Sequence, residues 1–121
     1  MADYLPKFNS GKPFTLASSA DVIGGRVLVA SGAGTVAASG ADAANVVGVA
    51  AFDALTGEPV TIFPRSGGVQ KLVASAAIAA GALVISAAAG KIATVGTGVN
   101  PIGIALTAAT ADLDVVDVLF I

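Results

Sequence analysis

The sequence predicts an all-β protein, a small barrel or sandwich built from two related halves of short strands. The first observation is an internal repeat. Leu16–Ala38 aligns with Leu72–Thr94 without a gap, and Asn45–Ala50 aligns with Asn100–Ala105 after a shift of one residue. Of these 29 positions, 10 are identical and seven more exchange Val, Ile and Leu. Such self-similarity indicates a duplicated supersecondary unit, and two copies make a pseudo-symmetric domain, because a solenoid needs three or more.

The second observation is the spacing of apolar residues and glycines. Short runs rich in Val and Ile are separated by glycines, as in small β-barrels and sandwiches. Alanine, with 27 of 121 residues, favours helices. However, no amphipathic helical stripe persists for three turns, so we expect roughly ten short strands and at most single helical turns at Ala43–Ala44 and Ala108–Ala111.

The N-terminal segment reads as an extended arm. Residues 1–12 contain Tyr4, Leu5 and Phe8, and Pro6 blocks a regular helix. A frayed terminus is one interpretation. Since disordered tails are normally poor in aromatic residues, we favour an arm that packs on a neighbouring molecule. The remainder, 13–121, is predicted to be a single β domain with halves of about 13–66 and 67–121.

The strands of the first half follow from short apolar runs and turn signals. Gly48 lies inside one run and predicts a bulge or a close approach of backbones. Hairpin chemistry at Ser31–Gly34 and turn chemistry at Leu55–Pro59 separate the runs. The predicted strands are Phe14–Leu16, Arg26–Ala30, Thr35–Ala37, Val46–Ala50 and Val60–Phe63.

The second half repeats this order after the Pro/Gly-containing loop 64–68. A turn is expected at Ala88–Gly90. The predicted strands are Val69–Val73, Ala82–Ser86, Lys91–Val95, Ile102–Leu106 and Leu113–Ile121.

Composition excludes several classes of function. The chain has no Cys and no His, which removes thiol chemistry, the commonest general base and the commonest transition-metal ligands. The net charge is −2 and no basic run exists, so we expect no nucleic-acid partner. The uncharged stretch Leu72–Gly90 has the length of a membrane span. Its first copy contains Asp21 and Arg26, so neither copy is expected to cross a membrane, and the N-terminus lacks a signal-peptide pattern.

No motif indicates catalysis, a metal or a cofactor. Gly32–Ala37 approaches a dinucleotide fingerprint, but the second copy has lost its first glycine and kept the flanking strands, so a turn explains it better. Asp112, Asp114 and Asp117 are the densest carboxylates. On a strand the first two share a face and Asp117 points to the other, which predicts a solvated sheet edge and no metal cage.

Two arginines are candidate interface anchors, because Arg is enriched at binding hot spots. Arg26 begins a strand and Arg65 lies in the loop between the halves. A plain surface charge is the alternative interpretation for each.

Taken together, these residues resemble the decoration (cement) proteins of tailed-phage heads. The segments that carry the resemblance are Met1–Phe8, Val46–Ala50, Ala77–Val84, Gly90–Ala93, Asn100–Ala105 and Asp114–Leu119. The resemblance implies a non-enzymatic virion protein, made in the host cytoplasm, that binds the major capsid protein on the outside of the assembled shell. It further implies a homo-trimer on the capsid that stabilises the head, with no cofactor. The candidate capsid-binding residues are Tyr4, Leu5, Pro6, Phe8 and Arg65.

Two other classes stay open. A stand-alone carbohydrate- or ligand-binding β module would fit the fold, although such sites usually carry exposed Trp or Tyr platforms. Trp is absent here and Tyr4 stands alone. The Ala77–Val84 segment is also similar to β-clip-type domains that accompany enzymes. Such a module is normally fused to a catalytic partner, which we do not expect for this chain.

Overall fold

The computed structural model describes residues 12–65 and 68–121, so the predicted arm with Tyr4, Leu5, Pro6 and Phe8 lies outside the described residues. The described chain is almost entirely β, with one short 3-10 turn, η1 (Ala88–Gly90). Its strands are β1 (Phe14–Ser18), β2 (Val27–Gly32), β3 (Thr35–Ala38), β4 (Val46–Ala50), β5 (Pro59–Pro64), β6 (Val69–Val73), β7 (Leu83–Ser86), β8 (Ile92–Thr94), β9 (Gly103–Ala105) and β10 (Val115–Phe120).

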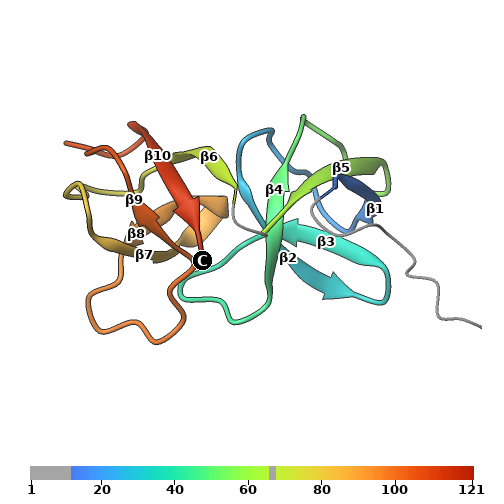
Figure 1. Ribbon diagram of the computed structural model, residues 1–121. Coiled ribbons are helices and arrows are strands. Elements are labelled where there is room, and N and C mark those ends of the chain that lie inside the picture. Colours follow the sequence, from blue (N-terminus) through green and yellow to red (C-terminus); the bar gives the residue numbers. More distant parts are fainter. Residues whose placement is uncertain (1–11, 66–67) are drawn as a thin grey trace, which may run out of the picture.

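The first half is a closed five-stranded barrel. Its strands follow the order β1-β3-β2-β4-β5, and β5 pairs with β1 to close the ring. All pairs are antiparallel except β1 with β3, which is parallel. Figure 1 shows this barrel, blue to green, beside the second group of strands, yellow to red.

The second half repeats the barrel with one weaker seam. Its sheet has the order β6-β10-β9-β7-β8. When β6 to β10 are taken as the repeats of β1 to β5, each strand has the same neighbours as in the first barrel, and the order is read in the opposite direction. The seam between β6 and β8 is a single parallel bridge, Ala74 to Ile92, where the first barrel pairs Ser18 with Val36. The prediction of an all-β protein of two related halves is therefore confirmed.

The repeat extends to individual hydrogen bonds. Val22 and Ala54 exchange backbone bonds of 2.8 and 3.1 Å in the first half. Ile78 and Ala109 exchange bonds of 3.0 and 2.9 Å at the equivalent place in the second half. These bonds join the turn after the first strand of each half to the turn before its last strand, so both halves hold their barrel ends in the same way.

Gly48 and Gly103 occupy equivalent places where two strands approach too closely for a side chain. A Cβ on Gly48 would lie 2.1 Å from the carbonyl oxygen of Phe63, and a Cβ on Gly103 would lie 2.6 Å from that of Leu119. Both contacts involve backbone of the next strand, which cannot move without breaking the sheet. The sequence predicts a bulge or a close approach at Gly48. The close approach is present there and at Gly103, and the pairing of β2 with β4 also shifts register between Gly48 and Val46.

The core has two parts, and one of them joins the halves. The interior of the first barrel is lined by Val22, Leu28, Val36, Ala50, Ala54, Val60 and Ile62. Val27 and Val49 neighbour interior residues in β2 and β4, and they point to the opposite face of the sheet. Together with Val46 they pack into the core of the second half, with Leu72, Ile92 and Phe120 among its members.

The single helical turns allowed at Ala43–Ala44 and Ala108–Ala111 are absent. The turn expected at Ala88–Gly90 is present as one turn of 3-10 helix, and Ala89 within it has a positive φ of 59°. The Leu72–Gly90 stretch forms strands and this turn, and no helix in the described part of the chain is long and apolar enough to cross a membrane.

The glycine contacts predict a steric effect on stability. Gly48→Ala and Gly103→Ala should each lower the free energy of unfolding by about 1–3 kcal/mol, because overpacking against fixed backbone forces a local shift. Gly40→Ala is the matched control, since its Cβ would meet no atom of the described residues within 4 Å. Urea denaturation of the three variants measures this. An unchanged midpoint for Gly48→Ala would contradict the close approach.

The core contacts between the halves predict cooperative unfolding. We expect residues 13–121 to unfold in one transition, because separating the halves would expose Val27, Val46 and Val49 together with the core they enter. Differential scanning calorimetry should give equal calorimetric and van't Hoff enthalpies. Two resolved transitions would show that the halves are separate domains.

Candidate partner-binding surfaces

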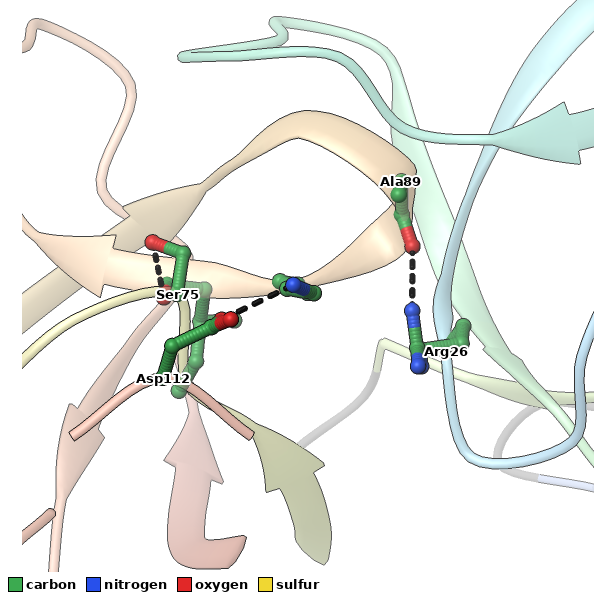
Figure 2. Close-up of polar contacts among 6 residues, drawn as sticks. Arg26, Ser75, Ala89 and Asp112 are labelled. Carbon is green, nitrogen blue, oxygen red and sulfur yellow. Dashed lines mark hydrogen bonds and ion pairs between the residues drawn. The ribbon is translucent and has the colours of Figure 1, made fainter. Parts of the chain in front are cut away.

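Both arginines singled out from the sequence bind backbone carbonyls of the second half. Arg26 donates from Nη1 to the carbonyl oxygen of Ala89 at 2.9 Å, a contact that Figure 2 shows between the two halves. Arg65 donates from Nη2 to the carbonyl oxygen of Pro101 at 3.1 Å. Both residues are partly buried. Each guanidinium therefore helps to tie the halves together, and a role of Arg65 in binding a partner stays a prediction.

Asp42 is a junction residue that sequence reasoning missed. Its carboxylate accepts backbone N–H groups of Val99 and Asn100, at 2.9 Å in the shortest case. Asn100 returns a bond from Nδ2 to the carbonyl oxygen of Asp42 at 3.0 Å. Asn100 is identical to its repeat equivalent Asn45, and this identity was the one signal in the sequence that Asn100 has a structural role. The partner of Asn100 could not be read from spacing, because it lies across the junction.

The three C-terminal aspartates do not form a strand edge, which corrects the sequence interpretation. Asp112 and Asp114 lie in the turn before β10, and β10 sits between β6 and β9 in the sheet. Asp112 pairs with Lys91 at 2.8 Å (Figure 2), and Asp117 lies 3.6 Å from Lys71 on the neighbouring strand. Surface pairs of this kind contribute little to stability.

Asp114 shapes its turn. Its Oδ2 accepts the N–H and the hydroxyl of Thr110, at 2.8 and 2.9 Å, and the N–H of Ala111 at 3.2 Å. These bonds from Thr110 and Ala111 lower the pKa of Asp114, because they favour the charged carboxylate. In the first half the N–H and hydroxyl of Thr56 lower the pKa of Asp21 in the same way.

An open pocket of about 390 Å³ lies at one end of the first barrel. Its walls are formed by Asp21, Val22, Ile23, Asp53, Ala54, Leu55 and Glu58. The carboxylates already accept local hydrogen bonds, as Asp53 does from the N–H of Gly24 at 2.7 Å. The second half has Ala77 and Ala108 in place of Asp21 and Asp53. The second half folds without these two carboxylates, so the fold does not require the acidic residues of the pocket.

Within residues 12–65 and 68–121, no three His, Cys, Asp or Glu side chains come together as metal ligands. In the same part of the chain every buried side-chain nitrogen and oxygen has a hydrogen-bond partner. What the described surface does offer is exposed aliphatic side chains on both halves.

Comparison with known proteins gives a family and a fold. Residues 9–120 match the family model described as phage cement protein. The search of curated proteins found no match. The crystal structure of the N base of head fiber gp8.5 from bacteriophage phi29 is similar, with a TM-score of 0.72. That likeness has 18% sequence identity and covers 91% of this chain and 93% of that chain, so it shows a shared fold.

The bonds to Asp114 predict a contribution to acid stability. Because the folded-state pKa lies below the ordinary value of 3.8, this contribution is present above that value and is lost as the pH falls through the lower folded-state pKa. We expect Asp114→Asn to have a lower Tm than the wild type at neutral pH. The difference in Tm between the two proteins should become smaller below about pH 4. Lys71→Gln, which removes an exposed ion-pair partner, is the control. Melting curves that stay equally far apart from pH 7 to pH 2 would contradict this role.

Proposed function

Because the chain belongs to the phage cement protein family, we propose that it binds the outer surface of the assembled major capsid shell and stabilises it without catalysis. Membership makes the chain a structural protein of a bacteriophage that associates with the capsid. The finer proposal concerns its partner, the major capsid protein, and a homo-trimeric arrangement on the outside of the shell. The family match over residues 9–120 is the observation that carries it.

The described structure is compatible with this role. A cement protein needs a compact body and contact surfaces, and here the two barrels share a core while aliphatic side chains remain exposed. Many copies on one lattice make weak individual contacts collectively tight through multivalency. The protein therefore does not need a single deep binding site to hold a capsid together.

The N-terminal arm is the proposed capsid-binding segment. Its apolar residues Tyr4, Leu5, Pro6 and Phe8 precede the described barrel, and they combine aromatic area with little charge. Aromatic side chains dominate many protein interfaces because they bury large areas. Arg65 is the proposed second contact, with one guanidinium nitrogen held by Pro101.

Deleting residues 1–10 should abolish binding to undecorated heads while leaving Tm nearly unchanged. The physical reason is that the barrel cores are formed by residues that follow the arm. Co-sedimentation with heads, titrated to saturation, measures binding, and heat resistance of the heads measures stabilisation. Full-length Tyr4→Ser/Phe8→Ser tests the aromatic residues alone, with Asn9→Ala/Ser10→Ala as the matched control. Unaltered binding by the deletion would contradict the role of the arm.

The pocket at Ile23 and Leu55 favours one alternative, a ligand-binding β module. Its walls combine aliphatic side chains with carboxylates, whereas sugar sites usually present an aromatic platform. A glycan array probed with the full chain tests this alternative. Specific glycan binding that Ile23→Ala abolishes, in a protein that does not bind heads, would favour the module over cementing.

A further inference from the structure

An apolar row crosses the outer face of the second half. Leu83 on β7 lies opposite Ile104 on β9, Ile104 lies opposite Leu119 on β10, and Leu119 lies opposite Val69 on β6. Residues directly opposite each other on neighbouring strands point to the same face. Leu83 and Val69 are 41% and 55% exposed, and the two between them are partly buried. Four branched aliphatic side chains thus form one continuous surface.

The first half has an equivalent row, and the second half covers two of its four members. The equivalents of Leu119 and Val69 are Phe63 and Pro13, and both are exposed. Val27 lies opposite Val49 in the first barrel, and these residues are 0% and 2% exposed. The repeat equates Val27 with Leu83 and Val49 with Ile104. A surface that the first barrel buries inside the molecule is therefore kept, in larger aliphatic residues, on the outside of the second barrel.

The hairpin that meets Val27 in the internal joint also has an equivalent in the first half, and that equivalent is uncovered. Where the halves meet, a Cβ on Gly90 would lie 2.7 Å from the Cβ of Arg26 and 3.0 Å from the carbonyl oxygen of Val27. The repeat equates Gly90 with Gly34, in the β2–β3 hairpin. Gly34 is exposed, and no atom of the described residues lies within 4 Å of its Cβ position. One chain therefore leaves the row of Leu83 and Ile104 and the Gly34 hairpin both accessible to a second copy.

We propose that the row of Leu83 and Ile104 docks on the β2–β3 hairpin end of the first half of a second copy. The contact repeats the internal joint between halves, so it is heterologous, and successive copies either close into a ring or continue as an open assembly. The inference rests on the proposed function in one respect. A ring of three copies built in this way is the trimer proposed on the capsid.

The contact between copies is expected to be weaker than the internal joint. That joint includes the bond from Arg26 to Ala89 and a bond from Ser39 Oγ to the carbonyl oxygen of Ala87 at 3.1 Å. The second half has Ala82 in place of Arg26 and Val95 in place of Ser39. The joint between copies therefore depends on apolar contact, and the high local concentration on a capsid lattice favours it.

Site-directed cross-linking of the full-length protein tests the geometry, since the chain has no cysteine of its own. Arg26 contacts Ala89 in the internal joint, and the repeat equates these residues with Ala82 and Ala33. In the proposed contact, Ala82→Cys of one copy would therefore lie near Ala33→Cys of the next copy. A mixture of these two variants, treated with a short bifunctional thiol reagent, should give a mixed dimer. Ala82→Cys mixed with Thr107→Cys is the control. Equal yields from both mixtures, or no mixed dimer at rising protein concentration, would overturn the proposal.

A second measurement tests the row itself. Leu83→Thr/Ile104→Thr keeps strand propensity and removes apolar area, so self-association measured by sedimentation velocity should weaken at least about tenfold. Ile23→Thr/Leu55→Thr changes two exposed aliphatic residues of the first half and should have no such effect. Loss of head binding with unchanged self-association would assign the row to the shell and refute the contact between copies. If the protein forms the cross-linked mixed dimer but does not bind heads, the contact between copies is supported and the proposed capsid-binding function is refuted.

Discussion

The arrangement of the two halves depends on the burial of Val27 and Val49. Both side chains point away from the interior of their own barrel, and exposed valines on β2 and β4 would cost about 1.5–3 kcal/mol each relative to burial. The second half covers them with its own core, and Arg26, Arg65 and Asp42 then find backbone partners across the same joint. The polar contacts fix the orientation of a joint whose stability comes from apolar burial.

The repeat made much of the fold predictable. Aligning the copies located all ten strands to within a few residues. Gly48 was predicted to be a bulge or a close approach because it interrupts an apolar run, and the close approach is present. The joint could not be predicted in this way. Strand periodicity shows that Val27 and Leu28 point to opposite faces, but it cannot say which partner covers the outer face. That depends on contacts between segments far apart in the sequence.

Local turn chemistry was the other limit. Leu113 adopts a positive φ of 72° at the place where the first half has Gly57 with a φ of 87°, so this turn has the same backbone conformation in both halves. The N–H of each residue donates to the equivalent carbonyl oxygen, Ser18 or Ala74, at 2.8 Å. Reading Leu113 as the start of a strand was reasonable from its apolar side chain. The repeat compels it into a turn, and the bonds to Asp114 hold that turn in place. Of the candidate capsid-binding residues, Tyr4, Leu5, Pro6 and Phe8 lie outside the described residues, and Arg65 contacts the carbonyl oxygen of Pro101.

Duplication also explains why the two halves differ where they do. Equivalent positions that both copies need for folding keep their residue type, as Gly48 and Gly103 do. Positions free of that requirement diverged, as Asp21 and Ala77 did. The positions of Leu83 and Ile104 belong to neither group, since they are partly exposed and yet are aliphatic in both copies. A solvent-facing strand position under no other constraint commonly becomes polar. The aliphatic side chains of Leu83 and Ile104 are therefore best explained by contact with another molecule, and the buried pair Val27 and Val49 in the first half indicates the shape of that contact.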